Sequence, residues 1–252
     1  MYESVEGSHI IVTGAAGGIG AGILKGLVKR GAHVAAIYNS TKPADDIVGI
    51  AKWYQCDLTN KSGVLSCFDA IVGELGGLDA LINVAGLWQS GPAEDADDEQ
   101  IDHIFAANVK SAIFTNQAAY RYMKESGGRI VNFGSLEAME GNARSPIYST
   151  VKGALHSWTR SAARSWGKYG ITVNAIAPLM HTPLVQSIRD SLSKEDLAKW
   201  NNHLVGRFAI GDGLGNAELD CTPMVAFLAS EGSHFITGQL LSVDGGMRMM
   251  GA

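Results

Sequence analysis

Residues 9–20 read HIIVTGAAGGIG, in which an apolar run ends at Thr13 and spaced glycines precede a stretch of helical period. Gly14 permits a tight turn, Gly18 lets the backbone approach a ligand, and Gly20 allows close packing of a helix on a strand. The N–H groups and the positive dipole end of that helix favour an anion. The stretch therefore predicts a pyrophosphate site, and a purely structural turn is the alternative.

The same rhythm of short apolar runs and longer stretches of helical period continues along the chain. Nearly continuous apolar strands separated by helices favour parallel pairing, since right-handed crossovers place helices on both faces of the sheet. We therefore predict an α/β fold of the Rossmann type, a doubly wound parallel sheet of about seven strands. The expected strands are residues 9–13, 33–38, 53–57, 78–86, 129–135, 171–178 and 239–246, and the expected helices are 18–30, 61–75, about 98–125, about 147–168 and near 216–230.

A single catalytic domain is expected for residues 1–252, because no linker, low-complexity tract or internal repeat interrupts this rhythm. The stretch at about 179–215 breaks the pattern, since it is long and polar and has no clear strand. An insertion of that length between a strand and a helix is usually a lid or a binding element. We expect a substrate loop there.

Composition narrows the classes of partner. A net charge of -5, with no basic run interleaved with aromatics, argues against nucleic acid. No stretch approaches the roughly 20 apolar residues of a membrane span, and the N-terminus lacks the regions of a signal peptide, so a cytoplasmic location is expected. The three cysteines have no CxxC spacing and the seven histidines no HExxH, which predicts reduced, buried thiols and no metal.

Acid–base chemistry is indicated by YSTVK at residues 148–152. The spacing places Tyr148 and Lys152 on one face of a helix, and a nearby ammonium lowers the pKa of a phenol, which makes it a usable general acid. Such a pair is common by chance on helical surfaces. Ser135, however, ends the strand thirteen residues earlier, at the carboxyl edge of the sheet where open α/β sheets bind ligands.

These motifs resemble those of the single-domain short-chain dehydrogenase/reductase family, and the resemblance runs through nearly the whole chain. The family's TGxxxGxG pattern matches residues 13–20, and its N-[NV]-A-G segment matches NVAG at 83–86. The four catalytic positions of the family match Asn108, Ser135, Tyr148 and Lys152 in order and spacing. The resemblance implies an NAD(P)(H)-dependent oxidoreductase that moves a hydride between the nicotinamide and a carbonyl or secondary alcohol, such as a carbonyl reductase.

The resemblance also implies a role for each catalytic residue. Tyr148 exchanges a proton with the substrate oxygen, and Ser135 hydrogen-bonds that oxygen. Lys152 lowers the pKa of Tyr148 and bonds the nicotinamide ribose, while Asn108 holds a water that connects Lys152 to solvent. The chemistry of the residues agrees, because a hydroxyl and an acidified phenol aimed at one oxygen stabilise a developing alkoxide.

The cofactor contacts that the resemblance implies extend from the glycine turn to the segment IAPLMHT at 176–182. For Asp57, a helix N-cap or turn carboxylate is an equal alternative to adenine contact. Leu179 stands where the family has glycine, a departure that would reshape the nicotinamide end of the pocket. The implied contacts are Gly14, Gly18, Ile19, Gly20, Tyr38, Asn39, Ser40, Asp57, Leu58, Asn83, Ala85, Gly86, Tyr148, Lys152, Pro178 and Thr182.

The choice between NAD and NADP depends on the residues that follow the second strand. An acid there would bond both ribose hydroxyls and repel a 2′-phosphate, but Tyr38 occupies that position. Gly17 supplies none of the positive charge of NADP-binding relatives, whereas Asn39, Ser40 and Thr41 offer neutral donors with Lys42 behind them. We expect NADP(H) to be preferred, with NAD(H) as the alternative.

The substrate side is predicted only by position in the family's cleft. The residues there are Trp88, Leu136, Glu137, Met139, Asn142, Leu179, Met180, His181 and Leu184. The mixture suggests a small or medium carbonyl or alcohol with an apolar body, although core packing and surface solvation are the plain alternatives. The apolar helix at 147–166 and the apolar C-terminal segment suggest a homo-oligomer, and the resemblance implies a tetramer.

Two other functions remain open at this point. A non-catalytic dinucleotide-binding regulator would use the same fold, because fold does not fix function, but four catalytic residues argue against it. A lyase or epimerase would also use this fold, and the members that act on nucleotide sugars need a longer substrate domain than 252 residues allow.

Overall fold

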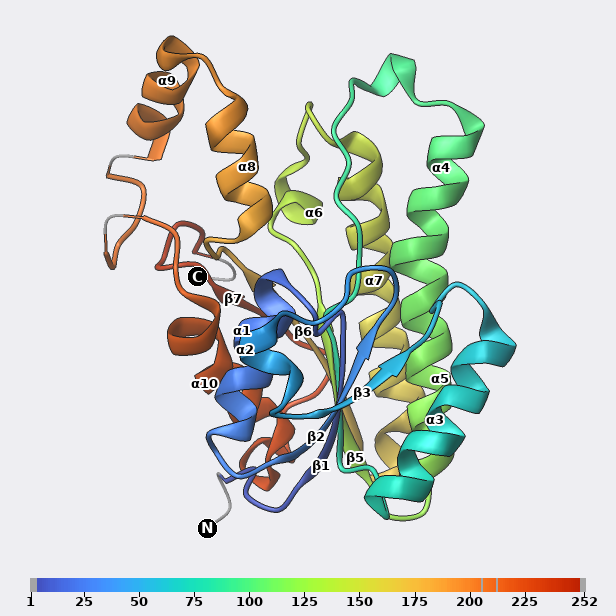
Figure 1. The fold of residues 1–252 in the computed structure, drawn as a ribbon. Helices are drawn as coiled ribbons and strands as arrows, with labels where there is room; N and C mark the ends of the chain where they lie inside the picture. The colour runs from blue at the N-terminus through green and yellow to red at the C-terminus, as the bar shows by residue number, and fades with distance from the viewer. Residues whose placement is uncertain (1–3, 205, 212, 250–252) are drawn as a thin grey trace.

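Seven parallel strands form one sheet in the computed structural model, which describes residues 4–249 apart from 205 and 212. The strand order is β3-β2-β1-β4-β5-β6-β7 (Figure 1). The strands are β1 (His9–Thr13), β2 (His33–Tyr38), β3 (Lys52–Gln55), β4 (Ala80–Asn83), β5 (Gly128–Phe133), β6 (Ile171–Pro178) and β7 (Leu240–Val243). The predicted Rossmann-type fold is confirmed, and the direction of winding reverses between β1 and β4, where such sheets open a crevice.

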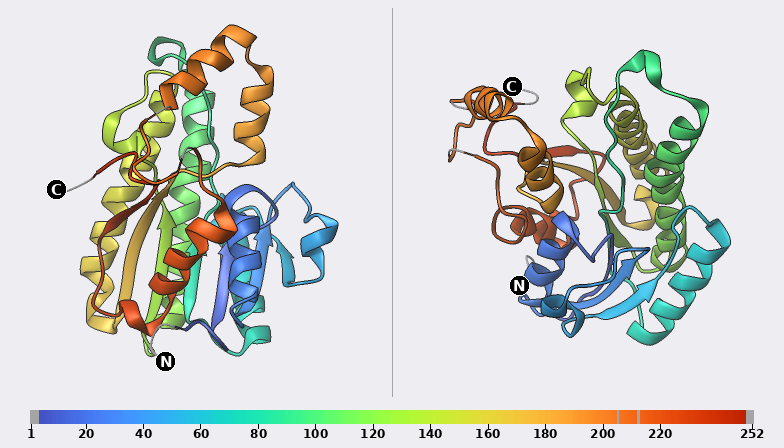
Figure 2. Two further views of the ribbon diagram at one scale, coloured as in Figure 1. Left: turned by 90° about the vertical axis from the view of Figure 1, so that its left-hand side faces the viewer. Right: turned by 45° about the horizontal axis from the view of Figure 1, so that its top comes forward.

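Helices cover both faces of the sheet. Helices α1 and α10 lie on one side and α3, α5 and α7 on the other (Figures 1 and 2). The helices are α1 (Gly18–Val28), α2 (Asp45–Val48), α3 (Lys61–Leu75), α4 (Asp98–Phe105), α5 (Ser111–Met123), α6 (Glu137–Glu140), α7 (Pro146–Trp166), α8 (Pro183–Ser191), α9 (Lys194–Leu204) and α10 (Thr222–Ala229). Since successive strand residues point to opposite faces, Ile10 and Val12 enter one core and Ile11 the other.

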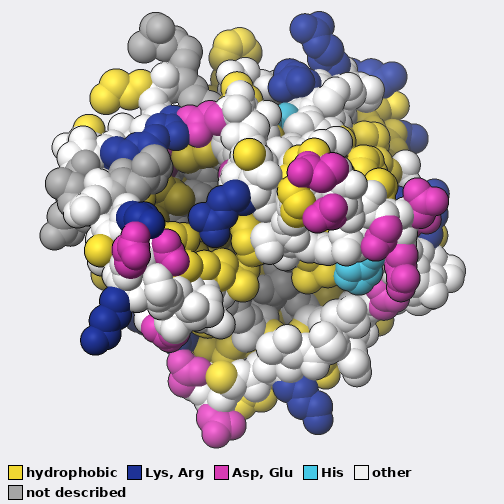
Figure 3. Space-filling model, turned by 90° about the horizontal axis from the view of Figure 1, so that it is seen from above, with side chains coloured by type: hydrophobic (Ala, Val, Ile, Leu, Met, Phe, Trp, Pro, Cys, Tyr) yellow, Lys and Arg dark blue, Asp and Glu magenta, His cyan; other side chains and the backbone are white. Residues whose placement is uncertain are grey.

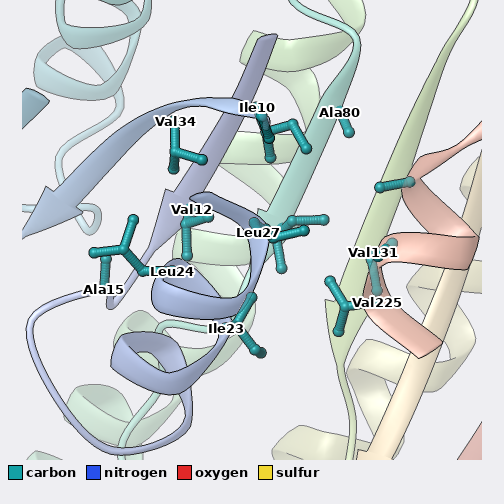
Figure 4. Packing of buried hydrophobic residues seen from close by; sticks show 14 of the residues in the cluster. Ile10, Val12, Ala15, Ile23, Leu24, Leu27, Val34, Ala80, Val131 and Val225 are labelled. Atoms are coloured by element: carbon teal, nitrogen blue, oxygen red, sulfur yellow. The ribbon is translucent and has the colours of Figure 1, made fainter. Parts of the chain in front are cut away.

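The core between β1 and α1 places the glycine-rich turn. Ile23, Leu24 and Leu27 of α1 pack beside Ile10 and Val12 (Figure 4), and all five are fully buried. Each such side chain contributes roughly 1.5–3 kcal/mol on burial. This packing fixes the start of α1 against the carboxyl end of β1.

The largest differences from expectation lie in three helical regions, whereas strands such as β4 are only shorter than expected. The single helix expected at 98–125 is divided by a π-helical turn, Ala106–Lys110, and the helix expected at 216–230 begins with another, Ala217–Cys221. The segment expected to be a long loop at 179–215 contains α8 and α9, and its residues 205 and 212 lie outside the described residues. Of the three cysteines, Cys67 is only partly buried, contrary to expectation.

None of the helices in the described part of the chain is both long and apolar enough to cross a membrane. Within the same residues, no group of three or more His, Cys, Asp or Glu side chains is arranged to hold a metal ion.

Close contact between α1 and α10 requires glycine at position 26. A Cβ there would lie 2.6 Å from Oγ1 and Cγ2 of Thr222, whose hydroxyl donates to the Ala217 carbonyl and whose side chain is fully buried. We expect Gly26→Ala to lower the free energy of unfolding by about 1–3 kcal/mol, because this overpacking outweighs the gain in helix propensity. Chemical denaturation measures the change.

The matched control is Gly73→Ala in α3, where an added Cβ meets nothing within 4 Å. It should raise the unfolding free energy by roughly 0.5–1 kcal/mol. Equal effects of the two variants would contradict the packing argument.

Candidate active site

The glycine-rich turn joins β1 to α1 with its glycines in constrained positions. Gly14 and Gly18 have φ of 64° and 54°, in the left-handed region. A Cβ on Gly20 would lie 2.1 Å from the Gly14 carbonyl oxygen, and one on Gly14 would lie 3.0 Å from the backbone of Ala85. The N-cap, Gly17, has no side-chain capping bond, so the first N–H groups of α1 are available to an anion.

A cleft of about 990 Å³ opens at the carboxyl ends of the strands, beside this turn. The view from above shows this face hollowed near its centre (Figure 3). The structure brings most of the predicted residues to its wall: Gly14, Gly18, Ile19, Gly20, Tyr38, Asn39, Ser40, Asp57, Leu58, Ala85, Gly86, Trp88, Ser135, Tyr148, Lys152, Pro178, Thr182 and Leu184. Segments far apart in the sequence therefore converge on one cleft.

Several predicted residues lie elsewhere. Met180, expected on the substrate side, is buried in the core on the α1 side of the sheet, and the Leu179 backbone pairs with Val243 and Gly215. Met139 is 58% exposed on α6. The residues Leu136, Met139, Leu179, Met180, Asn83 and Asn108 are not among those that line the cleft. Met180, expected to touch the substrate, thus has a structural position instead.

Asn83 belongs to a buried polar network behind the cleft. Its Oδ1 accepts hydrogen bonds from the hydroxyls of Thr13 (3.0 Å) and Thr115 (3.2 Å), and its Nδ2 donates to Asn132 Oδ1 (3.3 Å). The Thr13 hydroxyl in turn accepts from the Ala85 N–H. Because every member is bonded, the network fixes the ends of β1, β4 and β5 relative to one another.

Asn108 lies in the π-helical turn Ala106–Lys110 and is 1% exposed. Its Oδ1 accepts from the Leu87 N–H (3.2 Å), and its Nδ2 donates to the carbonyls of Leu87 and Ile104 (3.0 Å each). A Cβ on Gly86 would lie 2.6 Å from this Oδ1 and 3.4 Å from Lys152 Nζ. The Asn108 side chain therefore holds the loop after β4 against the wall of the cleft.

Ser135, Tyr148 and Lys152 meet where α7 passes the end of β5. Lys152 is 4% exposed, its Nζ donates to the Phe133 carbonyl (2.7 Å) and lies 5.6 Å from the centre of the Tyr148 ring. Burial lowers the pKa of Lys152 to about 8. Ser135 Oγ accepts from the Glu137 N–H (3.1 Å), and this hydroxyl also stands beside the Tyr148 phenol, where its hydrogen bond lowers the phenol's pKa.

The net shift of Tyr148 is opposite to the expected one. Burial, and then the carboxylate of Glu137, raise the pKa of Tyr148 to about 12, and the hydrogen bond with Ser135 offsets only part of this. Lys152 directs its ammonium to the Phe133 carbonyl instead of the phenol oxygen. The phenol is therefore protonated at neutral pH, the form that a general acid requires.

Tyr38, Asn39 and Asp57 define the other end of the cleft. Asp57 Oδ1 accepts from the N–H and hydroxyl of Thr59, the turn role that was the alternative, while the residue also lines the cleft. Tyr38 packs edge-on against Trp53, and the Asn39 carbonyl accepts from Gln55. Of Asp45 and Asp46, the first two acids after this end of β2, Asp46 is paired with Lys25.

Some residues of the wall were not predicted. His103, Ala107 and Ser111 line the cleft at intervals of four. The sequence could have indicated these residues, because positions four apart on a helix share one face and these three flank Asn108. Thr182, expected at the nicotinamide end, also caps α8 by accepting from the Val185 N–H.

Comparison with known proteins identifies the family. A family model described as enoyl-(acyl carrier protein) reductase matches residues 14–248. The L-2,3-butanediol dehydrogenase of Corynebacterium glutamicum is 34% identical over 257 residues, which span 94% of this chain and 97% of that protein. The chain is a short-chain dehydrogenase/reductase. The 3-oxoacyl-(acyl-carrier-protein) reductase of Salmonella typhimurium is also 34% identical, over 98% of this chain and 100% of that protein.

Structural comparison agrees with this assignment. A crystal structure described as a short-chain alcohol dehydrogenase of Sinorhizobium meliloti has a TM-score of 0.89 at 30% identity, over 98% of both chains. This short-chain dehydrogenase/reductase is accordingly an NAD(P)(H)-dependent oxidoreductase that acts on a small molecule.

The charge of Glu137 should set part of the pH dependence of this enzyme. Because the carboxylate raises the pKa of Tyr148, Glu137→Gln should move the rising limb of the pH profile of alcohol oxidation, which needs the phenolate, to lower pH. Gln keeps an oxygen acceptor for the Ser145 hydroxyl, which bonds Glu137 in the structure. Initial rates between pH 6 and 11 measure the shift.

The control is Glu140→Gln on the same helix, whose carboxylate pairs with Arg248 and is not among the causes of the Tyr148 shift. Its profile should match that of the parent enzyme. An unchanged limb in Glu137→Gln would show that burial alone sets the pKa.

Proposed function

We propose that this oxidoreductase reduces a carbonyl group, or oxidises the corresponding secondary alcohol, with Tyr148 as the general acid and base. The observation that carries the proposal is the meeting of Ser135, Tyr148 and Lys152 in the cleft that begins at the glycine-rich turn. A dinucleotide fits this cleft, because the cleft has a volume of about 990 Å³ and Gly17 and Gly18, which line it at the start of α1, place no side chain between the helix N–H groups and a ligand. When bound, the nicotinamide supplies or accepts the hydride.

The chain's own residues handle the proton. Tyr148, protonated at neutral pH, donates to the carbonyl oxygen as negative charge develops there. Ser135 Oγ already accepts from the Glu137 N–H, so its own proton, which bonds the Tyr148 phenol in the structure, would be donated to the same oxygen when substrate is bound. The ammonium of Lys152, held at the Phe133 carbonyl 5.6 Å from the centre of the Tyr148 ring, would favour the phenolate that remains.

The remaining contacts hold the dinucleotide along the cleft. The N–H groups at the start of α1 would bind its pyrophosphate. Asp57 and Leu58 would flank the adenine, and Pro178 and Thr182 would meet the nicotinamide end. Asn108 would act through the loop after β4, which its side chain fastens at Leu87, and a water relay from Lys152 past Asn108 remains part of the proposal.

The substrate would enter between this end of the cleft and α8. Trp88 and Leu184 line the cleft there, and Leu184 is 51% exposed. This apolar wall, next to the polar Ser135 and Tyr148, supports a small or medium carbonyl with an apolar body. Helices α8 and α9, within the insertion at about 179–215 of the single catalytic domain, would serve as the substrate element.

We also propose a cytoplasmic homo-oligomer, a tetramer as the family resemblance implies. Exposed apolar side chains such as Phe235 (94%) and Leu219 (70%) support self-association. The last three residues of the C-terminal segment that suggested an interface, 250–252, lie outside the described residues.

Tyr148→Phe tests the chemistry. The variant keeps the ring and loses the proton donor, so turnover of a ketone panel should fall at least about 10²–10⁴-fold while the dissociation constant of the cofactor changes little. Absorbance of the reduced nicotinamide reports the rate, and fluorescence titration reports binding. Turnover that survives the change would refute the assignment of Tyr148, and binding without any turnover in the parent protein would favour a regulator.

NADP(H) should bind more tightly than NAD(H). Ser40, Thr41 and Lys42 are exposed behind the end of β2, Asp46 is engaged by Lys25, and no carboxylate among the cleft-lining residues follows that strand before Cys56. Fluorescence titration with NADPH and NADH measures the preference. Lys42→Ala should weaken NADPH binding and leave NADH binding unchanged, and a preference of the parent enzyme for NADH would overturn the proposal.

A further inference from the structure

His156 is a buried histidine that the chemistry described above does not use. It lies on α7 one turn after Lys152 and two turns after Tyr148, so the three side chains share one face of the helix. Only 4% of the residue is exposed, and it is not among the residues that line the cleft. Its position is therefore behind the site and not in it.

The ring of His156 contacts the backbone that carries Ser135. Its Nε2 lies 3.3 Å from the backbone nitrogen of Ser135, whose N–H donates to it. The preceding residue must be small, since a Cβ on Gly134 would lie 2.3 Å from the same Nε2. Gly134 donates its N–H to the Ile176 carbonyl of β6, as a residue of the sheet would. In the segment Phe133–Ser135, the N–H of Ser135 is therefore the first to bond α7 and not the sheet.

Two side chains of one helix thus hold two successive parts of this segment. Lys152 Nζ bonds the Phe133 carbonyl, and His156 Nε2 accepts from the Ser135 N–H. Both anchors rise from the helix that carries Tyr148, so they fix the position of Ser135 relative to the phenol. A displacement of about 1 Å between such groups is enough to slow a reaction strongly.

Only a neutral imidazole with its proton on Nδ1 can accept at Nε2. Burial, and then the charges of Lys152 and Arg160 that face the ring, lower the pKa of His156 to about 4. The acceptor therefore persists across neutral and alkaline pH.

We propose that His156 is a positioning residue that, by accepting the Ser135 N–H, holds the Ser135 hydroxyl in register with the Tyr148 phenol for the transition state. The inference rests on the proposed function, in which both hydroxyls serve one substrate oxygen.

His156→Leu keeps the size of the side chain and removes the acceptor. It should lower kcat about ten- to a hundredfold, less than the loss of a whole transition-state donor, with the dissociation constant of the cofactor unchanged. His156→Gln offers an amide oxygen to the same N–H and should return kcat to within about threefold of the parent. Failure of Gln to restore kcat, or an unchanged kcat in His156→Leu, would overturn the proposal.

A double variant separates positioning from stability. If His156 acts through Ser135, then Ser135→Ala should remove the effect, so that Ser135→Ala and the pair with His156→Leu turn over equally. If the losses of kcat in the two single variants instead multiply in the double variant, His156 acts by another route. Thr159→Val is the matched control, because it deletes another buried acceptor of α7, which serves Asn132, and should lower the melting temperature without lowering kcat.

A measurement independent of turnover completes the test. Imidazole ¹⁵N NMR of the full-length protein should show His156 neutral and unprotonated at Nε2 between pH 6 and 9, and the Ser135 amide should exchange faster in His156→Leu than in His156→Gln. A proton on Nε2 would overturn the inference whatever the activity. Absence of turnover with every carbonyl would instead defeat the proposed function and leave this measurement to decide.

Discussion

Parallel pairing of all seven strands is the constraint on which the rest of the molecule depends. It brings every carboxyl end to the same edge of the sheet, so β1, β4, β5 and β6 deliver their following loops to one place. The reversal of winding between β1 and β4 keeps those loops apart. The cleft is a consequence of topology, and the side chains in it are placed by the elements behind them.

Burial sets the protonation states in this cleft. Removal from water raises the pKa of Tyr148 to about 12 and lowers that of Lys152 to about 8, so the phenol holds its proton more tightly than the ammonium does, the reverse of their order in water. The buried ammonium is compensated by the Phe133 carbonyl, as a charge removed from water requires. The same bond ties α7 to β5, so one interaction serves both electrostatics and geometry.

Much of the fold was predictable because hydrophobic periodicity is local. The strands were found within a few residues, since buried parallel strands are continuous apolar runs. The break of the expected helix 98–125 was not found, because the π-helical turn Ala106–Lys110 reads AANVK and contains neither proline nor glycine to mark it. Helices α8 and α9 were missed for a different reason: both sequences are polar on average, and α8 buries none of its residues.

The sequence by itself determined the sheet, the glycine turn and the family to which the chain belongs, because these depend on spacing between neighbours along the chain. Tertiary structure decided which predicted residues reach the cleft: Met180 entered the core, and Asn108 turned its amide to the loop after β4. It also decided the direction of the Tyr148 shift. Burial and charge act through space between residues that are distant in sequence, so the spacing of a motif along the chain predicts neither of them.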